Sequence, residues 1–245
     1  MTGEGGRGDL VLSVVVPAYN ESATIETVAR SLRELPLRLE VIAVDDASTD
    51  GTGGILVRLQ RDGLLDRVIH HPVNRGKGAA LRAGIAAATG DVIAVQDADL
   101  EYDPGDLLAL LEPIRRGRAD AVYGSRFQGG PHRVLFFWHS VGNRVLTLLS
   151  NMFTNLNLTD MESCYKLVRR DLLQRLPLTS DRFGFEVEIT ARLAQAGARI
   201  WELPITYSGR TYAEGKKITW KDGAAAFFHI LRFNLFPPGG DWRKR

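Results

Sequence analysis

Short apolar runs alternate with longer amphipathic stretches through the first half of the chain. Runs rich in Val and Ile predict buried strands, because a strand covered on both faces is apolar on both sides. The stretches between them repeat apolar residues at helical spacing. The expected strands cover residues 10–16, 39–45, 67–70, 92–95 and 121–123, and the expected helices 22–35, 50–61, 78–88 and 104–114. This alternation predicts an α/β fold with a Rossmann-like, mostly parallel sheet and helices on both faces.

Two apolar segments of the second half, residues 135–153 and 224–236, are the nearest candidates for membrane spans. A span needs about 20 apolar residues. The first segment is broken by His139 and Arg144, and the second is short and contains His229. Both segments instead predict amphipathic helices, which lie either on a core or on a membrane surface.

Length, composition and charge set further limits. A chain of 245 residues fits one domain, which we divide into a first half at 10–127 and a second half at 128–235. We expect a flexible N-terminus at 1–9 and a basic tail at 236–245. Residues 206–245 hold eight Lys or Arg against three Asp or Glu, a net charge of +5, whereas the first 205 residues carry −3. This asymmetry favours attraction to phosphate or to an anionic surface.

Cysteine usage and the N-terminal sequence bear on the compartment. Cys164 is the only cysteine, so the chain has no internal disulfide and no cysteine-based zinc site. The first nine residues are Gly-rich and lack the apolar core of a signal peptide. We therefore expect a cytoplasmic location.

Polar clusters follow the ends of the expected strands, at residues 17–21, 45–52, 74–78 and 97–101. In open parallel sheets, ligands bind at the carboxyl ends of the strands. The clusters contain neither the glycine pattern of a dinucleotide site nor a complete P-loop. The architecture is therefore of a nucleotide-binding type without either common fingerprint.

Asp97 and Asp99 follow the strand expected at 92–95. Alternate residues of a strand point to the same side, so the two carboxylates can lie close together on one side of the sheet. They repel unless a cation or hydrogen-bond donors lie between them. Oxygen ligands suit Mg²⁺ or Mn²⁺. A turn or helix-capping role is the simpler alternative for either residue.

Two further clusters fit phosphate or nucleoside recognition. Residues 74–78 open an expected helix, whose free N–H groups favour an anion. Lys77 in this loop would meet a phosphate or remain solvated. Asp45 and Asp46 end the second expected strand, and either could accept hydrogen bonds from a base or ribose.

Five motifs together resemble glycosyltransferase family 2 enzymes with a GT-A fold. They are VPAYNE at 16–21, DDASTDGT at 45–52, NRGKG at 74–78, DADLE at 97–101 and GSR at 124–126. The resemblance extends over residues 10–231 and is narrower still to the dolichol-phosphate mannosyltransferase and polyprenyl-phosphate glucosyltransferase group. It implies C-terminal helices on the acceptor side of the fold.

The resemblance also implies roles for individual residues. Asp97, Asp99 and Glu101 would bind the metal, although many relatives carry Gln at the last position. The catalytic residues would be Asp99, Arg126 and Asp160. Arg126 would donate two hydrogen bonds to a phosphate, and a surface ion pair is its alternative role. For Asp160 the alternative is a structural role. The nucleotide-sugar-binding residues would be Pro17, Tyr19, Glu21, Asp46, Lys77, Asp97, Ala98, Arg210 and Lys216.

The expected activity is an inverting, metal-dependent transfer of a hexose from GDP-mannose or UDP-glucose to a polyprenyl phosphate. A phosphate monoester has its second pKa at about 6 and needs no general base to attack at neutral pH. The enzyme would lie peripherally on the cytoplasmic membrane face, alone or with a membrane-protein partner, and no nucleic acid is expected. The alternatives are a soluble or glycan hydroxyl acceptor, with Asp160 as the base, and a binding module that has lost catalysis.

Overall fold

The computed structural model describes residues 10–134, 136–182, 184–211, 220–240 and 242. Four features expected from the sequence therefore lie wholly or partly outside the described residues. They are the N-terminus at 1–9, Lys216, part of the basic stretch at 206–245, and four positions of the basic tail, 241 and 243–245.

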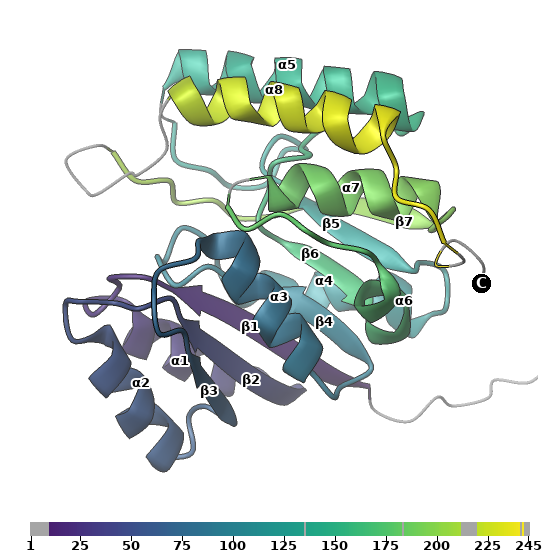
Figure 1. Cartoon of the computed structure of the whole chain (residues 1–245). Coiled ribbons are helices and arrows are strands. Elements are labelled where there is room, and N and C mark those ends of the chain that lie inside the picture. The colour runs from purple at the N-terminus through teal and green to yellow at the C-terminus, as the bar shows by residue number, and fades with distance from the viewer. Residues whose placement is uncertain (1–9, 135, 183, 212–219, 241, 243–245) are drawn as a thin grey trace, which may run out of the picture.

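Seven strands form one sheet at the centre of the molecule (Figure 1). They are β1 (Val11–Ala18), β2 (Arg38–Asp45), β3 (Arg67–His70), β4 (Val92–Val95), β5 (Ala121–Ser125), β6 (Lys166–Arg169) and β7 (Ile200–Pro204). Their order is β3-β2-β1-β4-β6-β5-β7. All neighbouring strands pair in parallel except β6, which pairs antiparallel with β4 and β5. The prediction of a mostly parallel sheet is confirmed.

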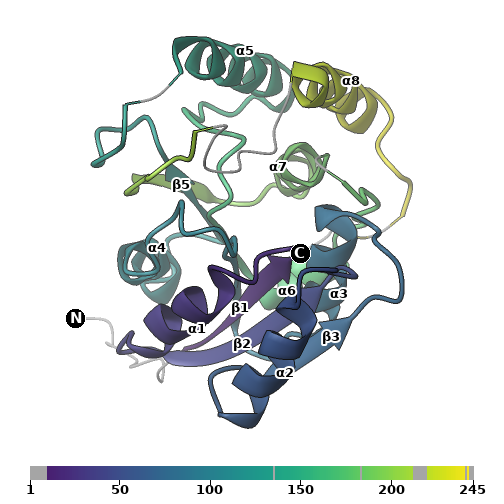
Figure 2. The ribbon, with the colours of Figure 1, turned by 90° about the vertical axis from the view of Figure 1, so that its left-hand side faces the viewer.

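Helices cover both faces of this sheet. The described helices are α1 (Ile25–Arg33), α2 (Thr52–Arg61), α3 (Lys77–Ala87), α4 (Asp106–Arg115), α5 (Phe137–Thr154), α6 (Arg170–Arg175), α7 (Phe185–Gln195) and α8 (Trp220–Leu235). Helices α1 and α4 lie on one face and α3, α6 and α7 on the other (Figure 2). Helices α5 and α8 lie side by side over α7 and form an additional outer layer (Figures 1 and 2).

All five expected strands and all four helices expected in the first half are present, with shifts of up to three residues at their ends. The largest shift is at α1, which begins at Ile25 because the preceding residues form turns. The segments expected at 135–153 and 224–236 are α5 and α8. Within the described part of the chain, no helix has the length and apolarity needed to cross a membrane.

The reversed direction of β6 positions the second half of the chain. Its first residue, Lys166, pairs with Tyr123 of β5, and Leu167 lies between Val122 of β5 and Ala94 of β4. Because β6 runs against both neighbours, the chain that enters it arrives at their carboxyl ends. The segment around Asp160 is therefore brought to the edge where the polar clusters of the first half lie.

Helix α3 packs very closely on β1 through a glycine. A Cβ atom added at Gly84 would overlap with the side chain of Val15, which is fully buried. Gly54 of α2 provides the contrast, because a Cβ atom there meets nothing within 4 Å. Alanine favours a helix over glycine by about 1 kcal/mol, so packing decides the sign of each substitution.

We expect Gly84→Ala to lower the free energy of unfolding by about 1–3 kcal/mol, because overpacking outweighs the gain in helix propensity. Gly54→Ala should raise it by about 0.5–1 kcal/mol. Urea unfolding of both variants measures the difference. A stabilised Gly84→Ala variant would show that α3 and β1 are less tightly packed than the structure shows.

Candidate functional site

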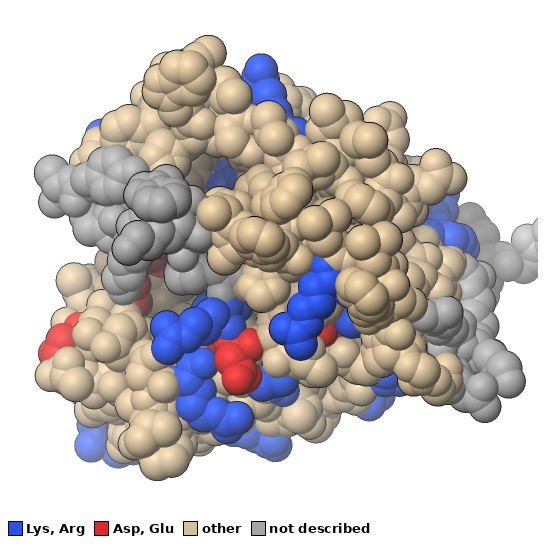
Figure 3. All heavy atoms as spheres, turned by 45° about the horizontal axis from the view of Figure 1, so that its top comes forward, with Lys and Arg blue, Asp and Glu red and all other residues tan. Residues whose placement is uncertain are grey.

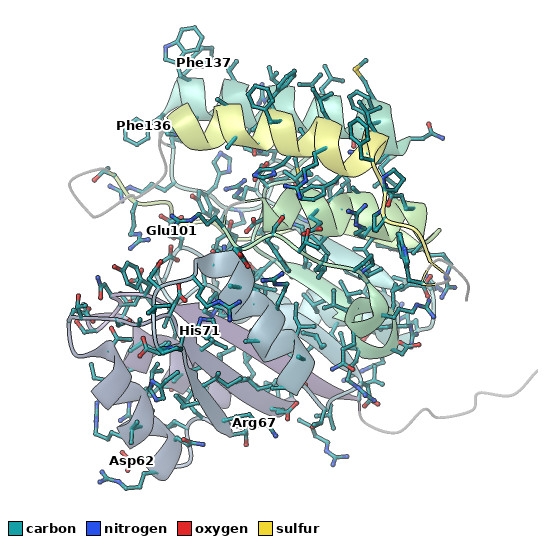
Figure 4. All side chains as sticks on the ribbon, in the orientation of Figure 1. Asp62, Arg67, His71, Glu101, Phe136 and Phe137 are labelled. Carbon is teal, nitrogen blue, oxygen red and sulfur yellow. The ribbon has the colours of Figure 1, made fainter. Side chains whose placement is uncertain are left out.

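The candidate site lies along the carboxyl edge of the sheet. The chain leaves β1, β2, β3, β4, β5 and β7 at this edge and enters β6 there. Glu101 lies at this end of the sheet, below the layer of α5 and α8, whereas His71 lies nearer β3 (Figure 4). The residues expected from the sequence fall into three groups along the edge.

The first group is the loop that follows β3, which is held by Asp46. This buried carboxylate lies 2.7 Å from His71 Nδ1 and accepts the backbone N–H groups of Arg75 at 2.9 Å and Gly76 at 2.7 Å. Asp45 is also engaged by the chain, with Ser48 N and His70 Nδ1. Asp46 therefore shapes the loop at 74–78, and its contact with a nucleotide stays a prediction.

The same loop contacts the chain that precedes α7. Gly76 has a φ of 98°, and a side chain there would collide with the carbonyl of Asp181. The backbone N–H groups in the first turn of α3 have no acceptor within the helix. One of them, the N–H of Ala79, donates to the Asp181 carbonyl at 3.1 Å. The remaining first-turn donors are the ones suited to a phosphate.

Lys77 is not a solvated surface cation. Its ammonium lies 2.8 Å from Asp97 Oδ1 and 3.1 Å from Glu186 Oε1 at the start of α7. Burial acts to lower the pKa of Lys77, but the two carboxylates outweigh it and hold that pKa well above its usual value. Lys77 therefore remains charged beside Asp97.

The second group joins the acidic motif to the chain that follows β7. Arg210 Nη2 lies 2.6 Å from Asp99 Oδ2, and its Nε lies 3.1 Å from Glu101 Oε1. The backbone N–H of Arg210 and the hydroxyl of Tyr207 also donate to Glu101, at 3.0 and 2.8 Å. Both oxygens of Glu101 thus hold the 207–210 segment, and Arg210 occupies the position of a counter-ion for Asp99.

The donor set of this group suits a divalent cation that brings further ligands. Burial and the charges of Asp97 and Glu101, opposed by Arg210, raise the pKa of Asp99 to about 7. The nearby Arg210 thus does not fully offset burial and the two neighbouring acids at Asp99. Among the described residues, no three His, Cys, Asp or Glu side chains are arranged to hold an ion by themselves. Mg²⁺ and Mn²⁺ fit such a site, because one or two carboxylates plus phosphate oxygens suffice.

The third group is an ion pair between Arg126, after β5, and Asp160. Nε and Nη2 of Arg126 donate to the two oxygens of Asp160 at 2.7 and 2.8 Å, and Asn143 of α5 donates to the same carboxylate at 3.0 Å. Burial acts to raise the pKa of Asp160, but Arg126 holds it below the usual value. Asp160 is fully buried. These contacts favour a positioning role for Asp160, with part of the Arg126 guanidinium left for another anion.

The remaining residues predicted to bind the nucleotide sugar lie at the end of β1 or beside the acidic motif. Pro17 is in β1, Tyr19 follows the strand with an exposed ring, and Ala98 is buried between Asp97 and Asp99. Glu21 Oε2 lies 4.0 Å from Arg210, so the first motif reaches the second group.

Four contributors were missed from the sequence: Asn143, Glu162, Glu186 and Tyr207. Glu186 lies on α7, which was not among the expected elements, although Phe185-Glu-Val-Glu188 is an acidic pair within an apolar stretch. Tyr207 and Asn143 have no local signal, because only the paths of β7 and α5 bring them to the edge. Glu162 lies only two residues after Asp160, which the sequence did indicate.

Comparison with known proteins identifies relatives of the whole arrangement. The model of the family described as glycosyl transferase family 2 matches residues 13–176. The undecaprenyl-phosphate mannosyltransferase of Micrococcus luteus is 34% identical over 211 residues, which cover 82% of this chain and 85% of the relative. The dodecaprenyl-phosphate galacturonate synthase of Rhizobium johnstonii is 30% identical over 215 residues, covering 84% of this chain and 62% of the relative.

Solved structures agree on the fold. The glucosyl-3-phosphoglycerate synthase of Mycobacterium tuberculosis, crystallised with Mn²⁺, UDP and glucosyl-3-phosphoglycerate, superposes with a TM-score of 0.72 at 24% identity, covering 94% of this chain and 82% of that one. The GT-A fold expected from the sequence is confirmed. The family match, the relatives and the fold lead to one conclusion, which is that the chain belongs to glycosyltransferase family 2.

Proposed function

We propose that the enzyme transfers a hexose from a nucleotide sugar to a polyprenyl phosphate, with inversion and with a divalent cation. The observation that carries this proposal is the position of Tyr207. Its hydroxyl donates to Glu101 at 2.8 Å, and its ring lies under the guanidinium of Arg126 at 5.2 Å. One side chain thus separates an acidic centre suited to a metal-bound diphosphate from a cation suited to an acceptor phosphate.

The residues divide the chemistry between them. A divalent cation on Asp99, with Asp97 and Glu101 beside it, would neutralise the charge that develops on the leaving nucleoside diphosphate. Lys77 lies on the same side and can donate to a phosphate oxygen. Arg126, oriented by Asp160, would hold the acceptor phosphate, whose oxygen attacks the anomeric carbon as the bond to the diphosphate breaks. Since that oxygen is already ionised, the step needs no base.

The names of the relatives support the acceptor class. The Micrococcus luteus and Rhizobium johnstonii relatives are named for transfer to undecaprenyl and dodecaprenyl phosphate. The first is named for mannose and the second for galacturonate, so the names do not select one donor, and GDP-mannose and UDP-glucose stay predictions from the sequence. We propose the cytoplasmic membrane face as the location, because nucleotide sugars are cytoplasmic substrates and the acceptor is a lipid.

The outer helices offer a surface for that membrane. The exposed large apolar side chains of α5 and α8 include Phe137, Trp138, Leu148, Met152 and Phe228. Figure 3 shows few charged side chains on the upper part of this face, whereas Lys and Arg gather lower down. Apolar patches of this kind mark membrane or protein contacts. Peripheral binding through α5 and α8, directly or with a membrane-protein partner, agrees with this surface.

The direct test is sugar transfer from UDP- and GDP-sugars to a short polyprenyl phosphate, with Mn²⁺, Mg²⁺ or EDTA. We expect a glycolipid from one donor and none with EDTA. Donor hydrolysis without glycolipid would discard the lipid acceptor. No turnover of any donor would favour a binding module.

Removing the charge of the central acid should stop transfer. We expect Asp99→Asn to lower kcat at least 100-fold, because the leaving diphosphate loses its stabilisation. Asp62→Asn, at the far end of α2 (Figure 4), is the matched control and should retain full activity. Equal activities of the two variants would remove Asp99 from the mechanism.

Arg126 should act on the acceptor rather than on the donor. Arg126→Lys keeps the charge but loses the planar fork, so we expect KM for polyprenyl phosphate to rise about tenfold or more. Asp160→Asn should shift KM in the same direction because it releases the guanidinium. Calorimetric binding of the donor should stay unchanged in both variants. Weaker binding of the donor in these variants would instead assign Arg126 to the nucleotide sugar.

Charges placed on the outer helices should weaken membrane binding. We expect Trp138→Glu combined with Phe228→Glu to lower the partition onto anionic vesicles at least tenfold, since each aromatic ring contributes about 1.5–3 kcal/mol when buried. Val57→Glu, which alters an exposed apolar residue of α2, is the control. Flotation assays measure the partition. Equal flotation of the unsubstituted protein, the double variant and Val57→Glu would contradict the assignment of this surface.

A further inference from the structure

Glu162 lies in the segment that leads from Asp160 into β6, and it carries an unsatisfied oxygen. Its Oε1 is buried and has no hydrogen-bond partner among the described residues. Glu188 of α7 shows how the fold treats a structural acid. Its two oxygens accept three hydrogen bonds, from the backbone of Thr179 and Ser180 and from the Thr179 hydroxyl, at 2.7–2.9 Å. A buried polar atom left without a partner is costly, so it needs an explanation.

The cation nearest to this segment in sequence does not supply the partner. Lys166 is almost fully buried, and its ammonium donates to the carbonyls of Met161, at 2.9 Å, and Ser163. It also lies 4.8 Å from the centre of the Tyr123 ring. Lys166 is therefore committed to fixing the turn before β6, and it offers Glu162 charge but no hydrogen bond.

Glu162 lies on a segment that contacts both substrate regions. Asp160, two residues before it, binds Arg126. Cys164, two residues after it, has its Sγ 4.0 Å from the backbone oxygen of Val95 at the end of β4. The Glu162 carboxyl is influenced by Glu186 and Lys166, and then by Arg126 and Asp160. Burial, followed by the charge of Glu186, raises the pKa of Glu162 to about 7. Glu186 binds Lys77 on the diphosphate side, whereas Arg126 belongs to the acceptor side.

During transfer, only the sugar lies between the leaving diphosphate and the attacking phosphate. We propose that Glu162, together with Glu186, accepts hydrogen bonds from hydroxyl groups of the transferred sugar and selects a neutral hexose over a hexuronate. This inference rests on the proposed function. Hydroxyl groups satisfy the unpaired carboxyl oxygen. The carboxylate of a hexuronate would meet two acidic side chains. Lys166 would offer it no hydrogen bond, because its ammonium already donates to two backbone carbonyls.

The test compares donors that differ only at C6 of the sugar. These are UDP-glucose with UDP-glucuronate, or GDP-mannose with GDP-mannuronate, according to the base that the donor panel identifies. For Glu162→Gln we expect 10–100-fold weaker binding of the neutral nucleotide sugar and unchanged binding of UDP or GDP. The ratio of kcat/KM for the neutral sugar over the hexuronate should fall at least tenfold. Glu112→Gln, an exposed substitution on α4, is the control.

A second variant guards against a simple folding defect. Glu162→Asp keeps the charge but withdraws the carboxylate, so it should weaken nucleotide-sugar binding while retaining discrimination against the hexuronate. Equal weakening of UDP or GDP and of the nucleotide sugar would overturn the inference, as would unchanged discrimination in Glu162→Gln. Failure of the unsubstituted enzyme to use any donor would overturn the proposed function itself, which separates the two.

Discussion

The antiparallel pairing of β6 with β4 and β5 determines which side chains can meet at the site. In a wholly parallel sheet, the residues before a strand lie at the edge opposite the ligands. Here the residues that precede β6, from Asp160 to Tyr165, arrive beside the carboxyl ends of β4 and β5. The acid that binds Arg126 reaches the site through this one reversal. A register shift in β6 would displace the whole acceptor side.

Charge compensation is the second constraint on the site. Three acids of the edge have a partner from another segment of the chain: Asp97 with Lys77, Asp99 with Arg210, and Asp160 with Arg126. Removing one partner of a buried pair costs about 3–5 kcal/mol, because the other charge is left unpaired. The free protein therefore tolerates a dense acidic centre because Lys77 and Arg126 of the first half and Arg210 of the second half supply its cations.

The sequence predicted the first half of the chain well, because the signals for its elements and motifs are local. The strand at 92–95 and the acids that follow it are adjacent in the chain, and the helix after Lys77 begins within one residue of the expected position. The contacts of the second half could not be predicted in this way. Arg126 and Asp160 were each identified, but their direct pairing depends on β6. The contact of Lys77 with Glu186 could not be predicted locally, because Glu186 lies 109 positions further along the chain.

The pairing of Arg210 with Asp99 and Glu101 has a consequence for the order of events at the site. An anionic diphosphate attracts Arg210 and Lys77 as strongly as the carboxylates do, so the two cations can exchange carboxylate for phosphate oxygens. Release of Arg210 would leave Asp99 beside Asp97 and Glu101. Burial, followed by the charges of these two acids, already raises the pKa of Asp99. The exchange is favourable only if another cation replaces Arg210 at Asp99. In the proposed reaction, the electrostatics of the edge would therefore couple the arrival of the donor to that of a divalent cation.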